Sequence, residues 1–190
     1  MHSLDWASTA SAFFAGLSAL AATATIYFSW RIQSSQEILN QTALSLERAY
    51  MTLTNNGTET KPPAADRLNW LTAARHIERY KKLKAKLAFD THRVVCEEQE
   101  EYWRHKIYTC LDAPHQLSLA YYKEKPHPER RAEIEPRSAL IIHDFAKWPE
   151  GREDPIDKVD INTMMSRKAI LEGNHGLKQY LDTLPRHHFP

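Results

Sequence analysis

The first apolar segment of the chain covers residues 7–30, and its first 23 residues carry no charged side chain. A stretch of about 20 apolar residues is long enough to cross the hydrocarbon core of a bilayer as a helix. Trp6 and Trp30 stand at its two ends, as aromatic side chains do at the two interfaces of a membrane. The pattern therefore predicts a transmembrane helix over residues 7–30, preceded by a short head at residues 1–6.

Two other interpretations of this segment stay open. Its many Ala, Ser and Thr residues also suit a buried helix of a soluble protein, and Ala22-Thr23-Ala24 resembles a signal-peptide cleavage site. Against cleavage, no Lys or Arg precedes the segment, and the apolar run continues beyond Ala24 to Trp30. We therefore expect an uncleaved anchor.

The basic residues near the segment predict its orientation. Arg31 follows it directly, whereas residues 1–6 contain neither Lys nor Arg. The more positive side of a membrane helix usually faces the cytoplasm. We expect a single-pass protein of the cell (inner) membrane, with its C-terminal domain in the cytoplasm.

A helical stalk is predicted over residues 31–54, because nothing there stops the helix that begins in the span. Apolar positions of the stalk recur every seven residues, as in a short coiled coil. In the same phase the span carries only small residues, with bulky side chains on the opposite face. This candidate helix-packing seam consists of Ser11, Ala15, Ser18, Ala22, Thr25, Ile32, Leu39, Leu46 and Leu53.

Small residues let two helices approach closely in lipid, so the seam predicts a possible parallel homodimer. The alternative is that its stalk half packs onto helices further along the same chain, which would leave the span monomeric.

Two strong helices are predicted after a loop at residues 55–65. Apolar residues recur every three or four positions over Asp66–Phe89, and a second helix runs from Asp90 to about Leu111. The outer face of the first carries Arg75, Arg79, Lys82 and Lys86, and that of the second carries Glu97, Glu98, Glu100 and Glu101. We expect an antiparallel hairpin whose opposite charges pair, with Trp70 and Trp103 largely buried.

The remainder is less regular but still favours helices. The expected elements are a short helix at 115–123, an exposed connection at 124–136, a buried helix at 137–148 (or a strand at 139–143), an acidic loop at 150–160, helices at 161–172 and 177–184, and a loose tail at 185–190. Residues 66–184 would then form one helical cytoplasmic domain, and the fold class is all-α.

Composition narrows the partners. The net charge of +1 provides no global field for nucleic acid, so none is expected. The two cysteines, Cys96 and Cys110, lie 14 residues apart on one predicted helix, hence about 21 Å apart. Because a disulfide needs Cα atoms within about 7 Å, we expect two free thiols.

No catalytic residue, cofactor site or metal site is assigned from the sequence. His92 and Cys96 share one helix face, as do Glu101 and His105, but about 13.5 Å of helix separates the two pairs. They cannot converge on one ion. His143-Asp144 matches a dipeptide of metal-dependent phosphohydrolases, without the further spaced ligands that such a site needs.

In layout, the chain resembles small uncharacterised bacterial proteins with one N-terminal span, a polar stalk and a helical cytoplasmic domain. The resemblance covers about the first 110 residues and rests on the Trp30-Arg31 boundary and on the stretches LNWLTAARHIERYKKLK and EEQEEYWRHKIY. It implies the architecture and no activity.

The function expected from these features is that of a membrane-anchored protein acting through contacts with an unknown protein partner, as an adaptor or as a regulatory or effector subunit. The first alternative is a membrane-tethered enzyme, most plausibly a metal-dependent hydrolase. The second is a soluble regulator whose apolar N-terminus is an oligomerisation helix.

Overall fold

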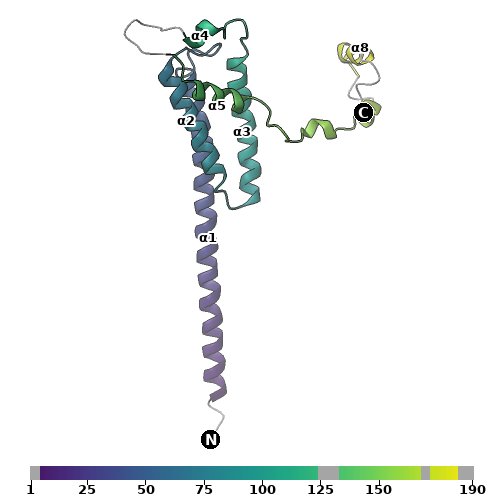
Figure 1. Cartoon of the computed structure of the whole chain (residues 1–190). Helices are drawn as coiled ribbons and strands as arrows, with labels where there is room; N and C mark the ends of the chain where they lie inside the picture. Colours follow the sequence, from purple (N-terminus) through teal and green to yellow (C-terminus); the bar gives the residue numbers. More distant parts are fainter. Residues whose placement is uncertain (1–4, 124–132, 168–171, 184–190) are drawn as a thin grey trace. The chain divides into compact units, whose positions relative to one another are not determined.

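The computed structural model describes residues 5–123, 133–167 and 172–183, and every regular element within these ranges is a helix (Figure 1). The expected all-α fold is confirmed. The chain divides into two compact units, Met1–Trp148 and Pro149–Pro190. Each unit is described by itself.

Helix α1 runs without a break from Asp5 to Leu53 (Figure 1). Its 49 residues correspond to about 73 Å of helix. Span and stalk are therefore one rod, as predicted. The helix ends where Asn55, Asn56 and Gly57 take positive φ angles of 49°, 58° and 82°, a conformation that Asn and Gly adopt most readily.

The N-terminal part of α1 is uncovered by the rest of the described chain. Every side chain from Thr9 to Gln33 is exposed, and Phe13, Leu20 and Ile26 are 65–70% exposed. This part of α1 is long and apolar enough to cross a membrane. Within the first unit, no described element packs against this part of α1.

Hydroxyl groups in this bare part are satisfied locally. Ser18, Thr23 and Thr25 each donate a hydrogen bond to the backbone carbonyl four residues earlier, over 2.8–2.9 Å. A lipid interior offers no partner to a polar group, so such internal bonds are what a spanning helix requires.

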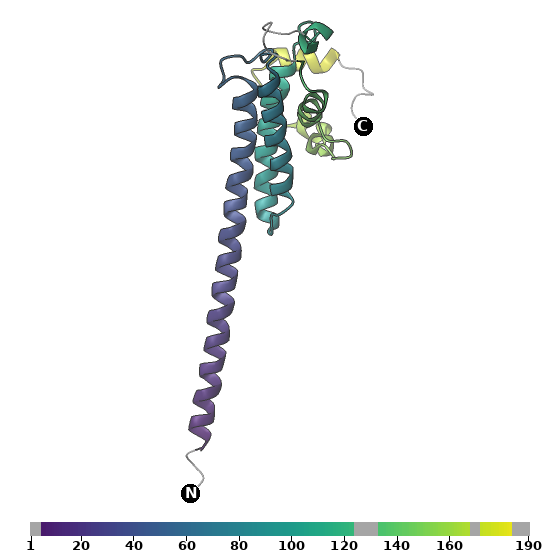
Figure 2. The ribbon, with the colours of Figure 1, turned by 60° about the vertical axis from the view of Figure 1, so that its left-hand side comes forward.

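The C-terminal half of α1 belongs to a helical bundle (Figure 2). The other members are α2 (Arg67–Lys84), α3 (Asp90–Leu111) and α5 (Pro136–Ala146), while α4 (Leu119–Lys123) lies in the connection before α5. Both α1 and α5 pack against α2 and α3. The two helices of the predicted hairpin, α2 and α3, are therefore connected through α1 and α5, each of which contacts both.

The bundle core collects the apolar stripes that the sequence shows. Leu46 and Leu53 of α1, Ile77 of α2, Ile107 of α3 and Ile142 of α5 are all fully buried. Burying one such side chain contributes about 1.5–3 kcal/mol relative to leaving it exposed. Convergence of four helices on these positions is what holds the bundle together.

The two predicted tryptophans differ in burial. Trp70 is fully buried, and its indole Nε1 donates to the carbonyl of Ala64 over 3.1 Å. Trp103 is only half-buried and stacks beside Tyr50, with ring centroids 5.6 Å apart. The expectation of a largely buried side chain therefore holds for Trp70, and Trp103 lies at the edge of the core.

Helix α2 ends at Lys84, earlier than the pattern predicted, because the turn at residues 85–89 packs against α1. Leu87 points into the core and is 2% exposed. The backbone N–H of Ala88 donates to Ser35 Oγ of α1 over 3.4 Å. The break therefore precedes Asp90, which begins α3.

For residues 137–148 the sequence left open a buried helix or a strand at 139–143. The structure has a helix, α5. Pro136 occupies its first turn, where a missing N–H costs nothing, and the Glu135 carboxylate accepts from the N–H of Ser138 over 2.8 Å. These start signals explain why a run that also suits a strand forms a helix.

The helix pattern predicted that Glu100 is one of the solvent-facing acidic residues of α3. The structure shows that it is buried instead. It is 7% exposed and accepts hydrogen bonds from Tyr80, Lys84 and Arg104. Burial alone would raise the pKa of Glu100, but these three donors together hold it below its ordinary value. Arg104 also donates from Nε to the carbonyl of Phe145 over 3.0 Å, so the cluster links α2, α3 and the end of α5.

Cys96 and Cys110 are free and buried, as expected. The Cys96 thiol lies 3.6 Å from Thr42 Oγ1 and 3.8 Å from the Tyr80 hydroxyl, beside the Glu100 cluster. Both thiols are part of the packed interior.

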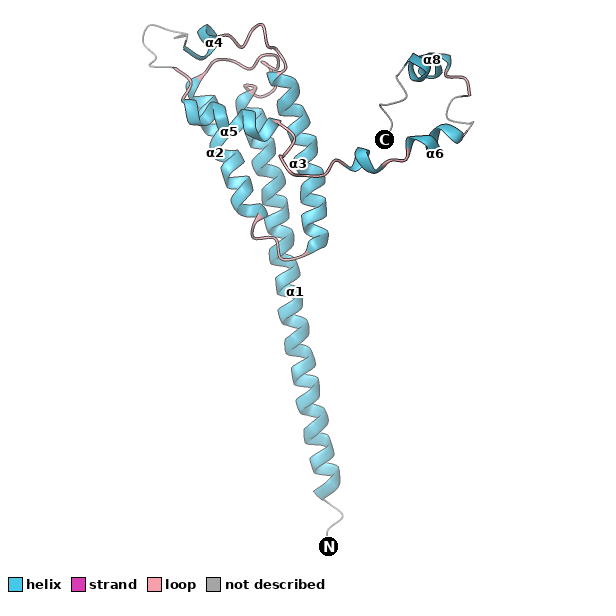
Figure 3. Cartoon of the chain, turned by 45° about the vertical axis from the view of Figure 1, so that its right-hand side comes forward, coloured by secondary structure: helices cyan, strands magenta, loops and turns pink. Residues whose placement is uncertain are grey.

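The described residues of the second unit form short helices joined by loops (Figure 3). The helices are η1 (Pro155–Lys158), α6 (Ile161–Ser166) and α8 (His175–Thr183). No described side chain of this unit is buried. Helix α6 is shorter than predicted, and the predictions for residues 168–171, 124–132 and 185–190 fall outside the described residues.

Candidate docking groove

The basic face of α2 does not lie opposite the acidic face of α3 in the way that the hairpin interpretation required. Lys84 reaches α3, with its Nζ bonded to Glu100 and 3.6 Å from Glu97 Oε1. Arg75, Arg79 and Lys82 instead line a groove between α2 and α5. We call it the α2–α5 groove.

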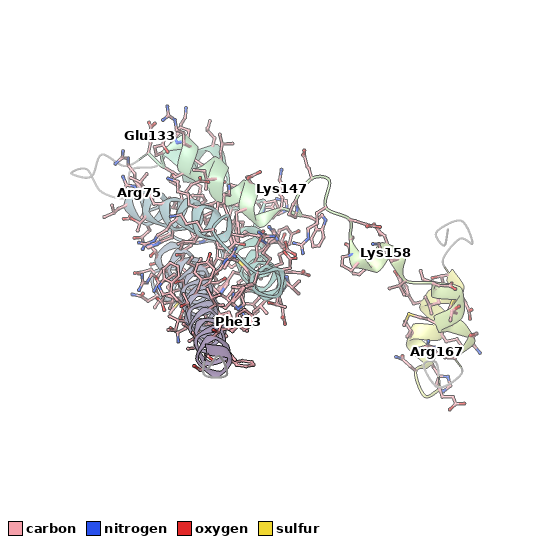
Figure 4. All side chains as sticks on the ribbon, turned by 90° about the horizontal axis from the view of Figure 1, so that it is seen from below. Phe13, Arg75, Glu133, Lys147, Lys158 and Arg167 are labelled. Carbon is pink, nitrogen blue, oxygen red and sulfur yellow. The ribbon has the colours of Figure 1, made fainter. Side chains whose placement is uncertain are left out.

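The α2–α5 groove has a volume of about 500 Å³, with apolar side chains at its floor and basic side chains at its rim. The floor is formed by Leu71, Ala74 and Ile141. The rim is formed by the exposed side chains of Arg75, Arg79, Lys82 and Arg137. Seen from below, Arg75 projects from the outer edge of the bundle on the side where Glu133 lies (Figure 4).

Two carboxylates also line the groove, and both already have partners. Glu78 forms an ion pair with Lys81 over 3.0 Å, and Glu135 accepts the capping hydrogen bond from Ser138. Neither forms an ion pair with a rim residue in the described structure. The four positive charges of the rim therefore exceed the two negative charges that line the groove.

Helix geometry explains why the rim is continuous. Arg75, Arg79 and Lys82 are four and three residues apart, so they lie above one another on one face of α2. Ser138 is 1% exposed and seats the first turn of α5 against α2, which brings Arg137 to the opposite edge of the groove.

His76 lies beside the rim, and the basic residues near it affect its pKa. His76 is half-buried next to Arg79 and to Arg48 of α1. Burial, together with the charges of Arg48 and Arg79, lowers the pKa of His76 below its ordinary value. The imidazole is therefore neutral at pH 7 and adds no charge to this face.

Exposed leucines extend the apolar surface beyond the floor. Leu68 is 65% exposed and lies one turn before Leu71 on α2, and Leu140 is 70% exposed and lies one turn after Arg137 on α5. A contiguous exposed apolar patch, rather than a single exposed side chain, is typical of a surface that contacts another molecule.

The predicted helix-packing seam is divided by the fold. Ser11, Ala15, Ser18, Ala22 and Thr25 lie on the uncovered part of α1, and Ile32 is 51% exposed. Leu39, Leu46 and Leu53 are 8%, 0% and 0% exposed within the chain's own bundle. The stalk half of the seam thus packs as the alternative described, onto helices of the same chain.

The sequence-level pairs with metal-ligand spacing have other partners. His92 Nδ1 lies 2.7 Å from Ser35 Oγ, and Cys96 is buried beside Thr42. Within the described residues no group of three or more His, Cys, Asp or Glu side chains is placed to hold a metal ion.

His143 and Asp144 point to different neighbours. His143 Nε2 lies 2.9 Å from the Tyr122 hydroxyl, within an aromatic cluster that includes Trp70 and Tyr121. Asp144 lies 3.7 Å from Lys81 Nζ at the surface. Burial, with Lys147 nearby, lowers the pKa of His143. His143 is therefore part of the packing between α4 and α5, whereas Asp144 is exposed beside α2.

Sequence reasoning found the basic residues of α2 but expected them to pair with the acidic face of α3, and it did not find the groove. The basic stripe of α2 was visible at helical spacing, whereas Arg137 and Ile141 carry no signal of their own. No family model matches the chain, and no curated protein or solved structure is significantly similar to it.

Proposed function

We propose that the chain is a single-span protein of the cell membrane whose cytoplasmic bundle docks an acidic, amphipathic helix of a partner protein. The observation that carries the proposal is the α2–α5 groove, an apolar floor under four basic rim residues, on a bundle that is continuous with a bare apolar helix. The role is that of an anchored adaptor or regulatory subunit.

The anchoring half rests on α1. Its uncovered segment combines length, lack of charge and internally bonded hydroxyls, which are the requirements of a membrane span. Arg31 immediately after the span favours the cytoplasm for the bundle.

The docking half rests on shape and charge. A helix laid in a groove buries its apolar side chains and presents others to the rim, a common mode of peptide recognition. The groove is lined by four positive and two negative residues, a net charge of +2. Of the two negative residues, Glu78 forms an ion pair with Lys81, and Glu135 accepts a hydrogen bond from the N–H of Ser138. Acidic residues on the partner helix fit this rim, and basic ones are repelled.

Energy in this mode divides between floor and rim. Each exposed ion pair contributes about 0.2–1 kcal/mol, whereas each apolar side chain buried on the floor contributes about 1.5–3 kcal/mol. We therefore expect the floor to supply most of the affinity, and the rim to select the sign of charge and to make association salt-dependent.

Photo-crosslinking in cells tests the docking proposal. A photoreactive amino acid at Leu71, on the groove floor, should capture a protein whose crosslinked segment is an acidic amphipathic helix. The same residue at Val94, which is 65% exposed on α3, is the control for general surface proximity. Identical products from both positions would contradict docking in the groove.

The captured segment, made as a peptide, then allows a direct measurement. Arg79→Glu should weaken its binding to the full chain in detergent at low salt, whereas Lys178→Glu on α8 should leave it unchanged. Equal affinities for both variants would show that the rim takes no part. Extraction of membranes with alkaline carbonate tests the anchor, since a spanning chain stays in the pellet.

Self-association through the span is a second proposed property, and the burial of the stalk leucines supports this location. Leu39, Leu46 and Leu53 are occupied inside the monomer, so a homodimer would use the small residues from Ser11 to Thr25.

A further inference from the structure

The turn between α2 and α3, residues 85–89, lies against α1 at the point where the apolar segment ends (Figure 2). Arg31 Cζ is 5.7 Å from the centroid of the Phe89 ring, and Ser35 Oγ lies 2.7 Å from His92 Nδ1. Arg31 and Ser35 are four residues apart, about 6 Å of helix. The turn is therefore within about one helical turn of the end of the span.

This end of the bundle carries exposed basic side chains. We call Arg31, Lys86, Phe89, Asp90 and Arg93 the membrane-proximal collar. Arg31, Lys86 and Arg93 are exposed, and Lys86 forms no ion pair with a described residue. Asp90 lies 2.8 Å from Arg93 Nη1 and offsets one of the three positive charges. A net charge of +2 remains beside the aromatic ring of Phe89.

The collar is held rigidly in this position. Leu87, in the middle of the turn, is 2% exposed, and its carbonyl accepts a hydrogen bond from Arg93 Nη2 over 3.1 Å. Ala88 is bonded to Ser35 on α1. Moving the turn away from α1 would break the Ala88–Ser35 bond and expose Leu87, so the basic side chains are held beside the end of the span.

We propose that the membrane-proximal collar binds the headgroups of anionic phospholipids in the leaflet where the span ends. The inference rests on the membrane span of the proposed function. The lipid phosphates would meet Lys86, Arg31 and Arg93, while Phe89 lies at the level where aromatic rings favour the interface.

Charge and distance explain why lipid is the partner that fits. The collar is covalently fixed beside the bilayer surface, where anionic headgroups are concentrated and any soluble partner must compete with them. Each basic side chain near an anionic surface strengthens attachment about five-fold, the equivalent of about 1 kcal/mol. Binding here would hold the bundle at one tilt relative to the bilayer. Arg75 precedes Lys86 by eleven residues, about 16 Å of helix, and therefore lies away from the membrane surface.

Selective quenching by labelled lipids tests the proposal on the full chain in nanodiscs. A fluorophore is attached at Ala85→Cys, an exposed position in the turn, while Cys96 and Cys110 are buried and unreactive in the folded bundle. Discs of one composition contain either phosphatidylglycerol or phosphatidylcholine that is spin-labelled near the headgroup. Quenching by labelled phosphatidylglycerol should exceed that by labelled phosphatidylcholine at least two-fold.

Matched variants assign the preference to the collar. Lys86→Gln and Arg93→Gln should each reduce the quenching ratio toward one, and 0.5 M salt should do the same. Lys106→Gln, at an exposed position on the same helix as Arg93 but about 20 Å further from the turn, should leave the ratio unchanged. Circular dichroism of each variant checks that the bundle is folded.

The outcomes separate the collar from the anchor. A ratio of one in the unsubstituted chain, or a ratio that Lys86→Gln and Arg93→Gln leave unchanged, overturns the headgroup site while the span stands. Failure of the chain to remain in the discs overturns the span itself, and the collar with it.

Discussion

Replacing Glu100 by Gln should test the buried charge cluster of the bundle most directly. The Glu100 and Arg104 side chains are 9% and 8% exposed, and Lys84, the other cation on this carboxylate, is 30% exposed. Arg104 Nη1 already has no hydrogen-bond partner in the described structure. Gln retains one carbonyl oxygen for the Tyr80 hydroxyl but removes the only negative charge of the cluster.

The expected cost follows from what is left behind. Breaking a buried ion pair from one side costs about 3–5 kcal/mol, because the remaining charge stays out of water without compensation. Small domains are stable by only about 5–15 kcal/mol, so Glu100→Gln removes about a fifth or more of that margin. Replacing Arg104 by Met in the same chain should recover most of the loss, since no unpaired guanidinium then remains buried.

The rate of thiol labelling at Cys96 measures this cost in detergent. Cys96 is fully buried, so a water-soluble reagent reaches it only when the bundle opens. A loss of 3–5 kcal/mol corresponds to labelling that is about 10²–10⁴ times faster, at tenfold per 1.4 kcal/mol. Glu98→Gln, an exposed carboxylate on the same helix, should change the rate less than about three-fold.

A change below about 1 kcal/mol for Glu100→Gln would refute the reasoning. It would mean that water reaches the cluster and screens its charges, and that α2, α3 and α5 are joined here by apolar contact alone. A loss that Arg104→Met does not reduce would locate the cost in packing around Gln rather than in the uncompensated charge.

Three further predictions concern pH, packing and the span. The pKa of Glu100 is held below its ordinary value, so its contribution to stability is present above the usual carboxyl range and is lost as pH falls through the lowered pKa. Thermal melts followed by circular dichroism should show this loss of stability in acid for the unsubstituted chain. The loss should be weaker for Glu100→Gln. Trp70→Ala should cost about 3–5 kcal/mol and Trp103→Ala about half as much, in keeping with their burial, and equal costs in urea unfolding would contradict the placement of Trp103 at the edge of the core. Changing both Ala15 and Ala22 to Ile should reduce cysteine crosslinking between spans while leaving the bundle melt unchanged, and unaltered crosslinking would exclude the small face as the contact.

Much of the architecture was readable from the chain itself because it depends on local patterns. The apolar run is long and rich in Ala, and no turn signal interrupts it before Asn55, so the rod from the span into the stalk was predictable. Asp is a residue type that favours helix starts, and the Asp66 carboxylate caps α2 by accepting from the N–H groups of Leu68 and Asn69. The all-α class follows from the 3.6-residue recurrence of apolar positions, which each helix shows without help from its neighbours.

What each face meets was decided only in three dimensions. A heptad of leucines shows that α1 has a packing face, but the same face suits a second copy or a neighbouring helix, and burial of Leu46 within the bundle settles that question for the stalk. Glu100 reads as one more surface acid, because periodicity cannot show that Lys84, Tyr80 and Arg104 from two helices converge on it. The α2–α5 groove likewise exists only once α5 packs beside α2. Local sequence specifies which residues avoid water, and tertiary contacts decide which of them meet.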